Sequence, residues 1–202
     1  DVANTVELLL TTVPGVEDIA EQELRSIAKD HDLDLVDTEL NPMGAQDQLS
    51  CQFDSSDEDA LLTSIRKMRS IHHVHRIRHQ FPIPAIDPLS AIREEAKSCP
   101  LPEMESAKSF RVTGHRKGLH NFTSVDIARA VGGVLHNRFG VRVDLEHFDL
   151  DVNVHAYEQT CALIIPQTQD ALNRHPNRVY LPRIGIQPAL AYCMLSLSGL
   201  ED

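Results

Sequence analysis

The sequence lacks the features that would place it in a membrane or at a metal centre. No stretch approaches the roughly 18 to 20 apolar residues of a membrane-spanning helix, and the longest apolar segments, such as Cys161–Pro166, have the length of a strand. No signal-peptide pattern is present. The four cysteines, Cys51, Cys99, Cys161 and Cys193, form no CxxC pair, which argues against a zinc site or a redox motif. We expect free thiols in a reducing environment, cytoplasmic or, in a eukaryote, also nuclear.

Basic residues are scarce in the first third of the chain. The net charge is −11, but residues 1–65 carry 16 acidic and 2 basic residues, whereas residues 66–202 carry 14 acidic and 17 basic residues. Screening limits the reach of a charge to about 8 to 10 Å, so binding depends on a local face and not on the total. The later part can therefore present a face to nucleic acid. The alternative is an acidic, solvated first segment and a neutral remainder.

The first 84 residues predict a ferredoxin-like domain. Apolar spacing and turn residues predict the order β-α-β-β-α-β over residues 6–83, which is the split βαβ arrangement. The expected strands are Val6–Thr12, Leu33–Val36, Leu49–Phe53 and His72–Ile83, with helices starting near Val16 and at Ser56, where Asp59 has capping-box spacing.

Residues 85–168 predict a second, smaller α/β unit, so the expected fold class is α+β. Its elements are a helix from Asp87-Pro88 to about Ser98, a strand Ser109–Gly114, a helix from Thr123 to Gly140, an alternating strand Phe148–Tyr157 and a buried strand Cys161–Pro166. Residues 169–202 predict a linker and a strongly apolar helix, Ala189–Ser198. A helix this apolar needs a packing partner.

The best binding candidate is the segment Arg111–Ser124, most of which we expect to be a polar, basic loop after a short strand. It would bring cations to a helix start, where free N–H groups and the positive end of the dipole favour a phosphate, and an aromatic ring could stack on a base. The expected RNA-binding residues are Lys108, Arg111, His115, Arg116, Lys117, Phe122, Thr123 and Ser124, with His120 as a further donor. The alternative is a solvated turn with Phe122 in the core and Asp126 satisfying the helix start.

A second basic cluster accompanies four histidines. Its members could line the RNA path as a rim or simply form a solvated face: Arg66, Lys67, Arg69, Arg76 and Arg78, with Arg174 and Arg178 in the linker. A metal site at these histidines is not predicted: His73 and His75 would share one strand face, but His72 and His79 fall on another face or too far along, and no carboxylate lies between Arg66 and Gln80. Acidic pairs such as Glu17-Asp18 lie near helix starts, where dipole and solvation roles explain them, so no catalytic residue is predicted.

The opening and closing motifs resemble a known family. Thr12-Val13-Pro14-Gly15-Val16-Glu17-Asp18, the Phe110–Pro166 segment and the end Gln187-Pro188-Ala189-Leu190-Ala191-Tyr192 are similar to THUMP-containing RNA methyltransferases, in particular tRNA guanine-N2 methyltransferases. The resemblance implies a ferredoxin-like domain intertwined with a THUMP domain, which together grip the 3′ CCA-bearing acceptor end of tRNA. It also implies that the last helix leads into a Rossmann-like catalytic domain that uses S-adenosylmethionine and often works with a small activator protein.

The sequence departs from this family where catalysis is concerned. It contains no Asp-Pro-x-Cys-Gly-x-Gly loop and no Asn-Pro-Pro-Tyr or Asp-Pro-Pro-Tyr motif, and Asn41-Pro42-Met43 is not a substitute. We therefore expect no cofactor site, metal site or catalysis in this chain; the resemblance assigns S-adenosylmethionine binding and catalysis to a domain beyond it. Two alternatives stay open: the THUMP module of another RNA-modifying enzyme (a thiouridine or pseudouridine synthase, or a ribosomal or small nuclear RNA methyltransferase), and a protein-interaction module.

Overall fold

The computed structural model describes residues 5–172 and 185–199, which form two compact units. One unit takes the described residues up to Arg76 and again from Gln167, and the other is Ile77–Pro166. The sequence placed the first boundary after residue 84, whereas here it lies inside a strand, β4 (Ile71–Pro82), that supplies residues to both units. The predicted α+β class is confirmed.

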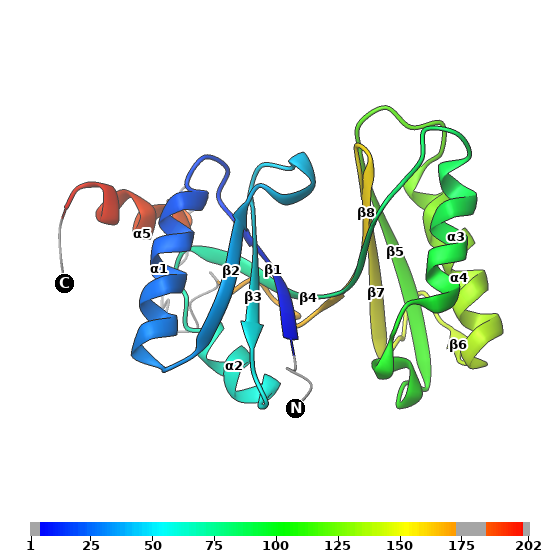
Figure 1. Ribbon diagram of the computed structural model, residues 1–202, viewed down its shortest axis with the longest axis horizontal. Helices are drawn as coiled ribbons and strands as arrows, with labels where there is room; N and C mark the ends of the chain where they lie inside the picture. Colours follow the sequence, from blue (N-terminus) through cyan, green and yellow to red (C-terminus); the bar gives the residue numbers. More distant parts are fainter. Residues whose placement is uncertain (1–4, 173–184, 200–202) are drawn as a thin grey trace. The chain divides into compact units, whose positions relative to one another are not determined.

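The first unit has the predicted ferredoxin-like order. Its sheet runs β2-β3-β1-β4, and each strand is antiparallel to its neighbours (Figure 1). The elements are β1 (Thr5–Thr12), α1 (Glu17–Asp30), β2 (Asp34–Leu40), η1 (Pro42–Gly44), β3 (Gln48–Asp54), α2 (Glu58–Ile65) and the first half of β4. The N-cap of helix α2 is Asp57, whose carboxylate accepts a hydrogen bond from Ala60 N at 3.0 Å, and not Ser56 as predicted.

Two segments that follow the second unit in the chain complete the first. Gln167 N donates to Val74 O at 2.8 Å, and Leu172 N donates to His72 O at 2.7 Å, so residues 167–172 run along the first half of β4. Helix α5 (Pro188–Leu197) is the predicted apolar helix, and it buries Ala189 and Cys193. Its remaining apolar side chains, Met194, Leu195 and Leu197, are exposed.

The second unit contains the predicted helices and strands, with one short strand in addition. Its sheet runs from the end of β4 through β8, β7 and β5 to β6, and β5 is parallel to both β7 and β6. Helices α3 and α4 lie against the sheet (Figure 1). The elements are α3 (Pro88–Ser98), η2 (Pro102–Glu105), β5 (Ser109–Lys117), α4 (Ser124–Phe139), β6 (Arg142–Val143), β7 (Leu150–Tyr157) and β8 (Thr160–Pro166).

Alternation along β7 and β8 builds the core of the second unit. Val152, Val154 and Ala156 turn one face of β7 toward the helices, as the period of two predicted. Helix α4 meets them with one apolar stripe, Ile127, Val131 and Leu135. The stripe ends at Gly140, where φ is +69° and a residue without a Cβ is favoured.

Strand β5 is longer than the sequence indicated. Its pairing with β7 continues through Arg116↔Ala156 and Lys117↔Tyr157, so the segment expected to be a loop from His115 onward is still a strand there. The loop proper covers residues 118–123. Local polarity predicted the loop, but a parallel partner more than thirty residues away decides the pairing.

Within the described ranges, none of the helices is both long and apolar enough to cross a bilayer. All four cysteines are free and buried, which agrees with the expectation of free thiols. Burial raises the pKa of the Cys99 and Cys161 thiols to about 12, so these side chains behave as small apolar groups in the core.

Candidate nucleic-acid interface

Strand β5 carries four of the predicted RNA-binding residues, and the first of them is engaged inside the protein. Arg111 Nη2 lies 2.5 Å from Asp151 Oδ2 on β7, and its guanidinium stacks 3.9 Å from the centre of the Phe148 ring. Thr113 Oγ1 donates to the other oxygen of Asp151 at 2.9 Å. The expectation that Arg111 meets RNA as an unpaired cation is therefore wrong, because a carboxylate from a distant segment neutralises it.

The end of β5 carries cations without such partners. His115, Arg116 and Lys117 are exposed, and neither Arg116 nor Lys117 pairs with a carboxylate among the residues that the structure describes. Arg116 Nη1 donates to His120 O at 3.3 Å, which folds the following loop back on the strand. Because side chains alternate along a strand, Arg116 points toward the helix side of the sheet and Lys117 toward the opposite side. The two flank the end of the strand and do not share one face.

Lys108 does not join this group. It is exposed and precedes β5, at the end opposite to Lys117. Nine residues of extended strand separate the two, which is about 30 Å at roughly 3.3 Å per residue. The predicted RNA-binding residues that can act together are therefore those at the C-terminal end of β5 and in the loop that follows.

The predicted capping box at the start of α4 is present. Thr123 Oγ1 accepts from Asp126 N at 3.2 Å, and Asp126 Oδ2 accepts from Thr123 N at 2.8 Å. These hydrogen bonds to Thr123 lower the pKa of Asp126, so its carboxylate stays charged at the helix start. Among the described residues, the N–H groups of Ser124 and Val125 have no acceptor, so the first turn still offers two donors.

Two neighbours of this helix start serve packing. Phe122 is 6% exposed and belongs to the hydrophobic core, so the expectation that it stacks on a base is wrong in this fold. Gly114 lies so close to α4 that a Cβ there would be 2.2 Å from Ser124 O. Its missing side chain lets the strand approach its own helix, which is what fixes the loop and the helix start together.

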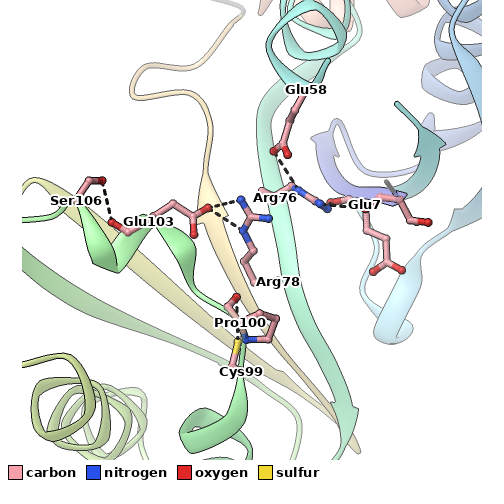
Figure 2. A network of polar contacts seen from close by, with 9 residues as sticks. Glu7, Glu58, Arg76, Arg78, Cys99, Pro100, Glu103 and Ser106 are labelled. Atoms are coloured by element: carbon pink, nitrogen blue, oxygen red, sulfur yellow. Dashed lines mark hydrogen bonds and ion pairs between the residues drawn. The ribbon is translucent and has the colours of Figure 1, made fainter. Parts of the chain in front are cut away.

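The arginines of β4 have structural partners (Figure 2). Arg76 is 7% exposed; its Nε donates to Glu58 Oε1 at 3.1 Å, and its Nη groups donate to the carbonyl oxygens of Glu7 and Thr5 at 2.9 and 3.2 Å. Arg78 Nε donates to Glu103 Oε1 at 2.7 Å. The sequence left open whether these two arginines line an RNA path or form a solvated face; in the structure, carboxylates on α2 and η2 hold both of them.

The remaining described residues of the second basic cluster also have contacts within the protein. Arg66 Nη2 donates to Gln167 O at 2.7 Å, and the Arg69 guanidinium lies 4.4 Å from the centre of the Tyr192 ring. Exposed Lys67 lies 3.4 Å from His31 Nε2 and has no carboxylate partner in the described part of the chain. Arg174 and Arg178 lie outside the described residues.

The histidines of β4 do not gather as ligands. The His73 and His75 rings are 5.9 Å apart, and His79 Nε2 lies 2.8 Å from Glu95 Oε2. Burial lowers the pKa of His72 and His73, which favours their neutral forms. No group of three or more His, Cys, Asp or Glu that could hold a metal ion occurs in residues 5–172 and 185–199.

Sequence reasoning missed two arginines on the helices of the second unit. Arg93 on α3 and Arg129 on α4 are exposed, have no carboxylate partner among the described residues, and line one groove. Arg129 lies six residues after the capping residue Thr123, close to the predicted site in sequence. Its position in the second turn of a helix whose start was already identified could have drawn attention to it.

Comparison with known proteins supports the resemblance that the motifs indicated. Residues 89–165 match the family model described as the THUMP domain. A tRNA (guanine(6)-N2)-methyltransferase from Thermus thermophilus is 36% identical in sequence to this chain. The aligned region covers 65% of this chain and 39% of that protein. The mouse tRNA (guanine(6)-N(2))-methyltransferase THUMP3 is 32% identical, in a region that covers 55% of this chain and 22% of that protein.

A solved structure extends the likeness to both units. The crystal structure of TrmN from Thermus thermophilus matches 96% of this chain with a TM-score of 0.79 and 30% sequence identity. The match covers 55% of that chain. The present chain thus spans about half of TrmN and between a fifth and two fifths of the curated relatives named above.

Proposed function

Residues 89–165 form a THUMP domain in a chain related to tRNA guanine-N2 methyltransferases, and from this premise we propose that the chain holds RNA for methylation by a catalytic domain outside it. The junction of β5 and α4 supports this most directly. There Arg116, on the helix side of the sheet, and Lys117, on the opposite side, carry charge with no carboxylate partner among the described residues, and the loop after them leads to the two open N–H groups of the first turn of α4.

The chemistry of this junction suits a phosphate. Backbone N–H groups at a helix start point outward and carry the positive end of the helix dipole, which favours an anion. On the helix side, arginine adds a planar fork of donors that matches phosphate geometry, and lysine on the other side of β5 adds a compact charge for a neighbouring phosphate. The capping box leaves this arrangement intact, because Asp126 satisfies the N–H of Thr123 and leaves those of Ser124 and Val125 open.

The proposed RNA is tRNA, gripped at its acceptor end with the single-stranded 3′ CCA. The relatives named above modify guanine 6 of tRNA, as their names state. Nucleotide 6, counted from the 5′ end, pairs in the acceptor stem close to the 3′ end. A module that holds the 3′ end would place that guanine within reach of an attached catalytic domain.

The catalytic domain would supply the rest of the reaction. We propose that the full-length protein uses S-adenosylmethionine as methyl donor, as methyltransferase relatives imply. A small activator protein would meet that domain, and the site of action would be the cytoplasm. Thiouridine or pseudouridine synthases are not favoured, because the curated relatives named above are guanine-N2 methyltransferases.

Salt-dependent binding tests this function. Fluorescence anisotropy with the whole chain should show tighter binding to tRNA with an intact 3′ CCA than to tRNA trimmed of it or to an unstructured RNA. Each phosphate contact contributes about 0.7 to the slope of log K against log salt for a single strand, so Arg116→Gln with Lys117→Gln should reduce the slope by about 1.4.

A matched control uses a cation that is already paired. Arg142 is exposed but lies 3.0 Å from Asp144, so Arg142→Gln should leave the slope unchanged. Equal, salt-independent affinity of the unaltered chain for all three RNAs would contradict the proposed function.

A further inference from the structure

We propose that the groove between α3 and α4 is a second phosphate-binding surface, which guides the RNA backbone away from the junction of β5 and α4. This inference rests on the proposed function and deepens it, since it adds two arginines that neither the motifs nor the comparisons identify. The ligand is the sugar–phosphate backbone of RNA.

One stripe of α4 forms the floor and one wall of the groove, and α3 forms the other wall. The lining residues, which enclose about 380 Å³, are Leu89, Arg93, Asp126, Arg129, Ala130, Gly133, Val134 and Asn137. Their spacing on α4 follows one helix face over eleven residues, which is roughly 16 Å at about 1.5 Å per residue. The groove is therefore elongated, as a chain of phosphates requires.

The arginines of this groove differ from several other cations of the second unit. Lys97, Arg111 and Arg142 each lie within 3.0 Å of a carboxylate, whereas Arg93 and Arg129 have no such partner among the described residues. An exposed arginine that is not neutralised is available for a bidentate hydrogen bond to a phosphate. Two such side chains lining one groove give it a positive character that complements RNA.

The acidic residue in the lining offsets only part of this character. Asp126 accepts from Thr123 N at 2.8 Å and from Thr123 Oγ1 at 2.7 Å, so its carboxylate is held at the capping residue, where it stays charged and interacts electrostatically with Arg129. With Arg93 and Arg129 counted against Asp126, the groove keeps a net positive charge. Asn137 at the far end adds a neutral donor and acceptor.

Small residues keep the floor open. Gly133 is exposed, and a Cβ built there would meet nothing within 4 Å. Glycine inside a helix costs about 0.8 to 1.0 kcal/mol relative to alanine. Together with Ala130 it lets a ligand approach the backbone of α4, and it also offers a position where a side chain can be added without a clash.

The groove continues the site already described. Thr123 and Asp126 form the capping box, and Asp126 also lines the groove, so the groove begins where the loop after β5 ends. A phosphate held near Arg116 is thus followed along α4 by Arg129. The lining also includes the apolar side chains of Leu89, Ala130 and Val134, so the charge of Arg93 and Arg129 is what favours a phosphate backbone as the ligand.

The test compares groove variants in the same salt titration with tRNA. Arg93→Gln with Arg129→Gln should reduce the slope by about 1.4, which is about 25-fold weaker binding at about 0.1 M salt if affinities converge near 1 M. Gly133→Glu should also weaken binding, because it places an acid on the open floor. Lys97→Gln, on α3 but paired with Glu94, and Gly133→Ala should both bind like the unaltered chain.

The outcomes separate this inference from the proposed function. If the Arg116 and Lys117 variant loses salt dependence while the Arg93 and Arg129 variant keeps it, the groove is not part of the RNA path and the proposed function stands. If the unaltered chain shows no RNA preference, the proposed function fails first. If the groove variant binds tRNA normally but no longer binds polyglutamate, the groove accepts an acidic peptide and the inference is overturned.

Discussion

Replacing Arg76 with methionine tests whether this side chain stabilises the fold or binds RNA. The side chain is buried and binds Glu58 on α2 (Figure 2). It also binds the carbonyl oxygens of Glu7 and Thr5 on β1, so α2, β1 and β4 meet at one guanidinium. We expect Arg76→Met to destabilise that unit strongly. An arginine on an RNA rim would instead be replaceable, because surface substitutions change stability by no more than about 0.5 kcal/mol.

The magnitude follows from what the substitution leaves behind. Removing one partner of a buried ion pair costs about 3 to 5 kcal/mol. The Glu58 side chain is 31% exposed and can be hydrated after the change, so we expect the lower end, about 3 kcal/mol. With a urea m value of about 1 to 3 kcal/mol per M, the midpoint should fall by about 1 M or more.

Urea unfolding followed by circular dichroism measures this shift, and Lys67→Met is the matched control. Lys67 belongs to the same basic cluster but is exposed and has no carboxylate partner among the described residues, so its midpoint should not move. The structural role of Arg76 is refuted if Arg76→Met unfolds at the unaltered midpoint while the salt slope of tRNA binding falls by about 0.7.

Three further variants test local features of the fold. Gly133→Ala should raise the free energy of unfolding by about 0.5 to 1 kcal/mol in urea titrations, because it removes a helix-interior glycine at a site with room for a Cβ; a lower value would mean the site is crowded. Thr123→Ala should lower that free energy by about 1 kcal/mol through loss of the N-cap, and an unchanged value would contradict the capping box. Burial lowers the pKa of His72 and His73 below 6.5, so their protonation opposes folding, and the stability of the protein should fall as the pH drops from 6.5 through the lowered pKa. In thermal melts between about pH 7 and about pH 5, the melting temperature of the His72→Gln, His73→Gln double variant should fall less than that of the unaltered chain. An identical fall would rule out these two groups as the cause.

The local sequence pattern was sufficient to predict the helices and strands and the N-terminus of α4. The alternation from Leu150 to Tyr157 and the spacing of Thr123 and Asp126 are set within a few residues, and both predictions are confirmed. The order of strands and helices in the first unit followed from the same short-range signals. These features depend on periodicity and on side-chain-to-backbone hydrogen bonds, which a sequence displays directly.

Contacts between segments far apart in the chain determine which basic side chains are paired, and the sequence alone did not show these contacts. Arg76 and Arg111 looked like free cations, but Glu58 and Asp151 lie 18 and 40 residues away from them. The same limit applies to β5, whose last residues are held by β7. A basic stretch in a sequence therefore shows where positive charge is, whereas availability for RNA depends on partners that only the fold reveals.

The insertion of one unit into the other also constrains the order of events during synthesis. Residues 77–166 are continuous in the chain, so every segment of the second unit is available once Pro166 has been added. The first unit must wait for Gln167 and Leu172, which bond to Val74 and His72, and for Cys193, which it buries. The N-terminal sheet, although made first, is thus completed last.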